Sequence, residues 1–223
     1  MLLKFTLLDN GADSLKSAYE NLETLKNIAE GGQHRLKDSV IFLNHGVELL
    51  LKLILKKHSP PLMFDKINEY LEAKQKLKKK EDAKTVFDIN KKLKTVSLFE
   101  ALTRVEYLCD IDIPENFRGS ILYVNKIRNQ FMHYEVELDE QETETLVTKL
   151  QICYEETIEF LEKHIEDLDD IIQDSRFELT TEEYEEQQAE IYAEIYYEDM
   201  SLEEMRLEAE YEEANAGDWY GRP

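Results

Sequence analysis

The stretch NHGVELLLKLILKK, residues 44–57, decides the fold of this chain. Residues 49–55 are apolar on nearly every side, whereas a helix at a protein surface carries only one apolar stripe. Such a helix has to be surrounded by other elements, so we expect residues 34–57 to form the central helix of the domain. Pro60-Pro61 should end it, because proline lacks the backbone N–H that a helix interior uses.

Amphipathic segments on both sides of this helix predict an all-α protein. Their apolar residues recur at three- and four-residue spacing, which is the period of one helix face. The segments are residues 13–30, 63–80, 97–109, 120–134 and 139–172. Only seven Gly and four Pro occur in 223 residues, and the connections are short. Long helices with short connections favour an antiparallel up-and-down bundle.

Local signals set several expected helix ends. Asp13-Ser14 should cap the first helix, because short polar side chains accept hydrogen bonds from the first backbone N–H groups. Turns are expected at Asp9-Asn10-Gly11 and at residues 113–116. Residues 1–8 could form a short strand or a packed lead-in.

The net charge of −22 is unevenly distributed. Residues 178–223 contain sixteen acidic and two basic residues, a balance of −14, which leaves 33 acidic and 25 basic residues, or −8, in residues 1–177. This asymmetry predicts two parts, a helical bundle at 1–177 and an acidic, mostly helical tail at 178–223. Within the tail, residues 179–215 keep helical periodicity and residues 217–223 should form an unstructured end.

The sequence also argues against several classes of protein. No apolar run reaches the roughly eighteen residues of a membrane span, so no membrane association is expected. Cys109 and Cys153 each lie in an apolar helical pattern, which predicts buried thiols in a cytoplasmic protein rather than a disulfide. Neither a metal nor a cofactor is expected, since no glycine-rich phosphate loop and no zinc-spaced Cys/His set occurs.

One stretch of this acidic chain is strongly basic. Residues 74–94 contain nine lysines and three acidic residues. An acidic protein repels nucleic acid at long range, so any RNA binding needs a local basic site. Lys78, Lys79 and Lys80 are the candidates for RNA contact; the alternative is that they are a solvated helix end.

The stretch RNQFMH, Arg128 to His133, holds the candidate catalytic residues. Arg128 projects from the edge of the apolar stripe of its helix, where an unpaired cation is costly. Asn129 and His133 are four residues apart and share a face. Arg128 and His133 are five apart, roughly 140° around an ideal helix, so they converge only if the arginine bends back. The alternative is a purely structural role, with the arginine paired to a core glutamate.

This stretch resembles the RxxxxH motif of the HEPN superfamily: Arg128 is followed directly by Asn129, and four residues separate Arg128 from His133. Residues 44–52, with Glu48 and Lys52 in an apolar run, look like an earlier HEPN helix, and residues 94–102 are similar to the entry into the intervening helix. The resemblance covers roughly residues 13–170 and implies a HEPN-like helical bundle.

Many members of this family resemble metal-independent endoribonucleases in which two protomers join their motifs at one cleft. The resemblance implies a homodimeric ribonuclease, a toxin or abortive-infection effector of phage defence, that cleaves RNA through the 2′-hydroxyl. His133 would be the acid/base, Arg128 the phosphate clamp and Asn129 an orienting group. Glu48 would hold Arg128 or position His133, and Lys52 would add positive potential to the cleft.

Two other functions fit the sequence. The chain could be a non-catalytic dimerisation or interaction module whose acidic tail docks an antitoxin or a defence-complex protein through its regularly placed tyrosines. It could also be a nucleic-acid mimic, in which rows of glutamates imitate phosphates.

Overall fold

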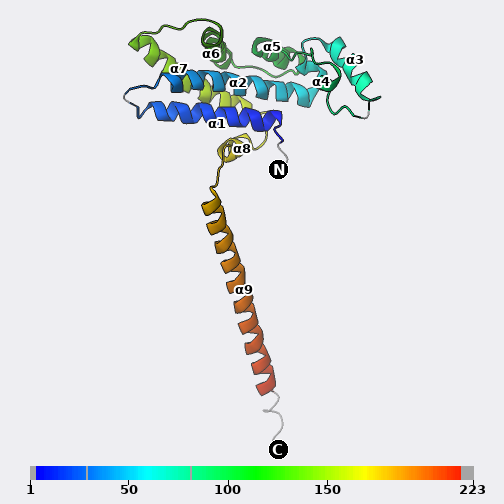
Figure 1. Cartoon of the computed structure of the whole chain (residues 1–223), viewed down its shortest axis with the longest axis vertical. Coiled ribbons are helices and arrows are strands. Elements are labelled where there is room, and N and C mark those ends of the chain that lie inside the picture. The colour runs from blue at the N-terminus through cyan, green and yellow to red at the C-terminus, as the bar shows by residue number, and fades with distance from the viewer. Residues whose placement is uncertain (1–3, 29, 81, 217–223) are drawn as a thin grey trace, which may run out of the picture. The chain divides into compact units, whose positions relative to one another are not determined.

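The computed structural model describes residues 4–28, 30–80 and 82–216, with side chains through residue 212. Over these residues the chain forms nine α-helices, one 3-10 turn and no strand longer than an isolated bridge (Figure 1), so the prediction of an all-α protein is confirmed. The chain divides into two compact units, Met1–Arg176 and Phe177–Pro223.

The first unit is built on helix α2, Gln33–His58, as the apolar sequence of this segment predicted. Helix α1, Leu7–Leu25, lies antiparallel beside it, joined by the short connection visible in Figure 1. Helices α5 (Leu98–Leu108), α6 (Glu115–His133) and α7 (Glu140–Leu161) also contact α2. Their buried apolar side chains merge into one core. This packing is that of a helical bundle.

Helices α1 and α2 approach closely because each places a glycine beneath a leucine of the other. A Cβ atom added to Gly11 would lie 2.6 Å from Leu50, and one added to Gly46 would lie 2.9 Å from Leu15. The Cβ atom added to Gly46 would also lie 3.1 Å from the carbonyl oxygen of Gly11. The two backbones therefore contact one another at a spacing that only glycine permits.

The turn predicted at Asp9-Asn10-Gly11 and the helix start at Asp13-Ser14 are both wrong. Thr6 caps α1 instead: its hydroxyl accepts the backbone N–H of Asp9, and the carboxylate of Asp9 accepts the N–H of Thr6. These hydrogen bonds lower the pKa of Asp9. Gly11 stays helical because packing against Leu50 outweighs the local preference for a turn.

The turn predicted at residues 113–116 is shorter than expected, since α6 begins directly after Pro114. Its first turn is fixed by Phe117, which stacks on Phe160 of α7 with ring centroids 4.8 Å apart. Burying this aromatic pair stabilises helical structure earlier than the sequence pattern indicated.

The single helix predicted over residues 139–172 is wrong, because the chain turns between Leu161 and Leu168. Asp167 takes a left-handed conformation, with φ of 55°, and helix α8 (Leu168–Asp174) follows it. The turn brings α8 against α1, where Leu168 and Ile172 are buried.

A small satellite lies between α2 and α5. It consists of the 3-10 turn η1 (Pro60–Met63), α3 (Ile67–Leu77) and α4 (Val86–Ile89) around a second buried cluster. The helix predicted at 63–80 is therefore shorter, since Phe64 is extended and bridges to Thr95. Arg104 of α5 donates to the carbonyl oxygens of Leu62 and Phe64, both at 2.8 Å, which ties the satellite to the bundle.

The second unit contains helix α9, Thr181–Ala216, which confirms the helix predicted at 179–215. The predicted unstructured end at 217–223 lies outside the described residues. Of the two free thiols, Cys153 is buried as predicted, and burial raises its pKa to about 12, whereas Cys109 is only half-buried. Among the described residues, no helix is both long and apolar enough for a membrane span.

Candidate functional site

A line of polar residues runs along the contact between α2 and α6. Asn44, fully buried on α2, donates through Nδ2 to Oδ1 of Asn125 on α6 at 3.2 Å. One residue beyond Asn44 is His45, and one turn beyond Asn125 is Arg128. Glu48 and Lys52 continue the line on α2. We call these six residues the polar seam: Asn44, His45, Glu48, Lys52, Asn125 and Arg128.

Lys52 is buried inside the bundle, with 6% of its surface exposed. Its ammonium group donates to Oε1 of Glu48 at 2.5 Å and to the hydroxyl of Thr95 at 2.9 Å. A buried ammonium needs such partners, because an unpaired charge in the core is costly. The structure thus gives Lys52 an internal ion pair, whereas the sequence predicted that it adds positive potential to a cleft. Glu48, which was expected to hold Arg128 or position His133, pairs with Lys52.

Arg128 and Asn129 lie at the solvent side of the polar seam. Arg128 is half-buried, Asn129 is exposed, and the Nη1 group of Arg128 donates to Oδ1 of Asn129 at 3.0 Å. This hydrogen bond leaves most of the guanidinium donors of Arg128 for another ligand, and an arginine presents its donors in a fork that matches a phosphate.

His45 follows Asn44 on α2, and much of its side chain is exposed to solvent. Partial burial lowers the pKa of His45, and the positive charges of Lys52 and Arg128 lower it further, while Glu48 acts in the opposite direction. Because this pKa lies below its usual value near 6.5, the imidazole is neutral at pH 7 and can accept a proton. The sequence offered only a faint signal for His45, namely its position three residues before Glu48.

His133 lies apart from this group. It is the last residue of α6 and is exposed, and among the described residues its side chain forms no hydrogen bond or ion pair. The five residues that separate it from Arg128 correspond to about 140° around the helix, so the two side chains leave α6 in different directions.

The predicted RNA contacts Lys78, Lys79 and Lys80 follow the end of α3 and are all exposed. In Figure 1, the label of α5 stands between those of α3 and α6, and Lys78–Lys80 follow α3, whereas Arg128 is on α6. They can add to a longer RNA path, but they do not form one compact site with the polar seam.

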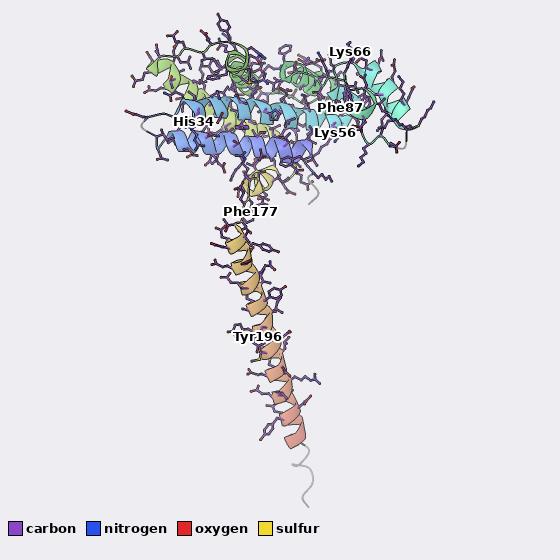
Figure 2. The ribbon with its side chains drawn as sticks, in the orientation of Figure 1. His34, Lys56, Lys66, Phe87, Phe177 and Tyr196 are labelled. Carbon is purple, nitrogen blue, oxygen red and sulfur yellow. The ribbon has the colours of Figure 1, made fainter. Side chains whose placement is uncertain are left out.

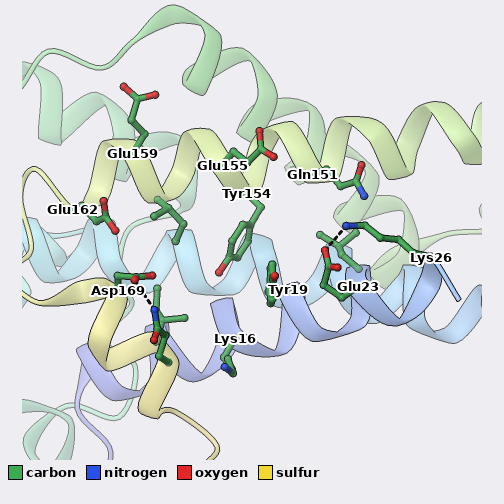
Figure 3. Close-up of a pocket in the computed structure, with 14 residues that line it drawn as sticks. Lys16, Tyr19, Glu23, Lys26, Gln151, Tyr154, Glu155, Glu159, Glu162 and Asp169 are labelled. Atoms are coloured by element: carbon green, nitrogen blue, oxygen red, sulfur yellow. Dashed lines mark hydrogen bonds and ion pairs between the residues drawn. The ribbon is translucent and has the colours of Figure 1, made fainter.

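A hollow of about 1060 Å³ lies between α1, α7 and α8 (Figure 3). Tyr19 and Tyr154 form part of its wall, with ring centroids 5.4 Å apart. Five carboxylates and two lysines also line it, a balance of −3, and its lining includes no residue of the polar seam. Its charge makes it unsuitable for a phosphate backbone.

Among the described residues, no group of three or more His, Cys, Asp or Glu is arranged to hold a metal ion. What the seam offers is an arginine on α6 and, on α2, a histidine whose pKa is lowered. In comparisons with known proteins, the chain matches no family model, no curated protein and no solved structure.

Proposed function

We propose that this protein is a metal-independent endoribonuclease with a HEPN-like antiparallel bundle, acting as a toxin or defence effector. The observation that carries the proposal is the hydrogen bond between Asn44 of α2 and Asn125 of α6, because His45 follows Asn44 directly and Arg128 lies one turn after Asn125. A phosphate-binding cation and a proton acceptor thus lie beside one contact, and those are the two groups that cleavage through a 2′-hydroxyl requires.

In the proposed reaction, the 2′-oxygen of RNA attacks the adjacent phosphorus and the bond to the 5′-oxygen of the next nucleotide breaks. Arg128 binds the phosphate and stabilises the charge on its oxygens. His45 takes the proton of the 2′-hydroxyl, and His133 supplies a proton to the leaving 5′-oxygen. The products are a 2′,3′-cyclic phosphate and a free 5′-hydroxyl.

The proposal requires a dimer. Because Arg128 and His133 leave α6 about 140° apart, His133 cannot easily reach a phosphate held by Arg128 of its own chain. In a two-fold dimer with α6 near the axis, the exposed His133 of one protomer lies at the site of the other.

The test is cleavage of an end-labelled, mixed-sequence, single-stranded RNA by the full-length protein in EDTA. Activity should persist without divalent ions, leave 2′,3′-cyclic phosphate ends, and be absent on the same sequence made of DNA. His133→Ala, His45→Ala and Arg128→Ala should each lower the cleavage rate by about 10²–10⁴-fold. His58→Ala is the matched control, since His58 is an exposed histidine at the far end of α2 and should not matter.

Mixing two inactive variants tests the shared site. In heterodimers of Arg128→Ala with His133→Ala, one of the two sites combines an intact arginine with an intact histidine. Equal mixing should therefore restore about a quarter of wild-type activity, since half of the dimers are mixed and each has one of two sites. Cleavage that requires Mg²⁺, or full activity of His133→Ala, would contradict the mechanism.

A further inference from the structure

Helix α9 exposes far more apolar surface than a solvated helix requires. It is 36 residues long, and every described side chain on it except Gln188 is exposed. Eleven of these side chains are large and apolar. Tyr196, labelled in Figure 2, is one of them. Helices derive most of their stability from packing an apolar face, and extended apolar surface marks an interaction site.

Part of this apolar surface follows a seven-residue repeat. From Tyr184 to Ala209, six apolar residues follow one another at spacings of seven, four, seven, three and four residues. These spacings fit the a and d positions of a coiled-coil heptad. We call this set the heptad face: Tyr184, Ile191, Ile195, Leu202, Met205 and Ala209. A repeat of 3.5 residues turns one line of side chains toward a second helix that winds around the first. In α9 this line is interrupted by polar residues at Gln188, an a position, and at Glu198 and Glu212, which are d positions.

The charges beside the heptad face oppose its pairing with a second copy of the chain. Between Thr181 and Ala216 there are fourteen acidic residues and one basic residue, Arg206, a balance of −13. In a parallel pair of copies, Glu194 of one chain would face Asp199 of the other, which is a like-charge contact at the flanking g and e positions. Two such helices repel one another at neutral pH.

Repulsion also acts within α9 itself. Five glutamates, from Glu182 to Glu198, are spaced four residues apart along one row of the helix. Like charges at this spacing destabilise a helix. The one ion pair of α9 within the described residues, Arg206 with Glu210 at 3.4 Å, lies outside this row. Cations supplied by another molecule would remove this repulsion.

We infer that the heptad face of α9 binds a basic amphipathic helix of another protein. The expected partner has apolar residues at its own a and d positions, Lys or Arg at the flanking positions, and a cation opposite Glu198, which occupies a d position. A nucleic-acid mimic would use the carboxylates but would have no role for the heptad face. The inference concerns α9 alone and does not depend on the proposed ribonuclease activity.

The experiment uses the full-length protein and two synthetic fluorescent peptides as probes. The patterned peptide has Leu and Ile at a and d and Lys at e and g over four heptads; the scrambled peptide has the same composition and charge with its apolar residues off that face. Fluorescence anisotropy should show tight one-to-one binding of the patterned peptide, together with a gain of helical circular dichroism. Salt should weaken this binding only partly, because the buried apolar contacts are not screened.

Leu202 and Leu207 provide a matched pair of variants. They are five residues apart and equally exposed, at 60% and 59%, but only Leu202 belongs to the heptad face. Leu202→Glu should weaken binding of the patterned peptide at least about tenfold, because it removes one buried leucine from the contact. Leu207→Glu adds the same charge and should change the affinity less than about twofold.

Three results would overturn the inference. The first is equal weakening by Leu202→Glu and Leu207→Glu, and the second is equal binding of the scrambled and patterned peptides, which would reduce the interaction to charge alone. The third is a dimer of the full-length chain at neutral pH that Leu202→Glu dissociates. That result would assign the heptad face to a second copy.

Discussion

Replacing Gly11 with alanine should destabilise the bundle, although alanine is the better helix former. Alanine is favoured over glycine inside a helix by about 1 kcal/mol. In α1, however, the new Cβ atom would lie 2.6 Å from both Cγ and Cδ2 of Leu50, which is fully buried. Overpacking a close-packed core costs about 1–3 kcal/mol. We expect a net loss of about 1 kcal/mol for Gly11→Ala.

Gly119→Ala is the control for helix propensity. Gly119 is an exposed position of α6 where an added Cβ atom meets nothing within 4 Å. Only the preference for alanine acts there, so this variant should be more stable than the wild type by about 0.5–1 kcal/mol. The same chemical change is thus expected to have opposite signs at the two positions.

A double-mutant cycle with Leu50→Ala isolates the contact. Leu50→Ala alone should cost about 2–5 kcal/mol, because it leaves a cavity between α1 and α2. In that background the added methyl group of Gly11→Ala meets no clash, so it should stabilise by about 1 kcal/mol, and the coupling energy should be about 2 kcal/mol. Urea midpoints from circular dichroism measure all four proteins. Additive effects, or stabilisation by Gly11→Ala alone, would refute the close approach of α1 and α2.

Two further predictions concern the polar seam. Lys52 is the deeper partner of the ion pair, with 7% of its side chain exposed against 25% for Glu48. Glu48→Met leaves the deeper charge unpaired and should destabilise the fold by about 3 kcal/mol, whereas Lys52→Met should cost clearly less in the same urea assay. Equal costs would contradict this asymmetry. The lowered pKa of His45 means that, between that pKa and about 6.5, the unfolded chain binds a proton that the folded chain does not. The free energy of unfolding should therefore fall as pH decreases through this window. Arg128→Gln should raise the pKa of His45, measured by NMR titration of its imidazole ring. An unchanged pKa would show that Arg128 is too far away to act on His45.

Sequence periodicity was sufficient for most of the helices but not for the places where tertiary contacts override it. The central position of α2 followed from its apolar sequence, because a helix that is apolar all round has to be covered. Asp9-Asn10-Gly11 has the composition of a turn, and only the leucine of a neighbouring helix explains why it is helical. The turn before α8 was also hidden, since apolar spacing continues through it and Asp167 is neither Gly nor Pro.

Of the candidate site, too, one feature was predictable from the sequence and another was not. The pairing of Glu48 with Lys52 could have been read from the sequence, because a glutamate four residues before a lysine is the favourable order on a helix, and the apolar run around Lys52 indicates burial. The position of His45 beside the contact with α6 could not be read from the sequence, because it depends on how α2 crosses α6. That geometry is set by side-chain packing and by the partly buried hydrogen bond between Asn44 and Asn125.

The negative charge of α9 is spread along a long helix, which limits how far α9 can inhibit RNA binding. At 1.5 Å per residue, the 36 residues of α9 span about 54 Å. At physiological ionic strength, exposed charges act over only about 8 Å. A single phosphate site can therefore lie within range of only a few of the fourteen carboxylates of α9, whatever position the helix takes. Most of them act only on molecules that lie along the helix itself, which favours a docking role for α9 over competition with RNA. The salt dependence of RNA binding should accordingly reflect Arg128 and the exposed lysines Lys78–Lys80, while that of partner binding reflects α9.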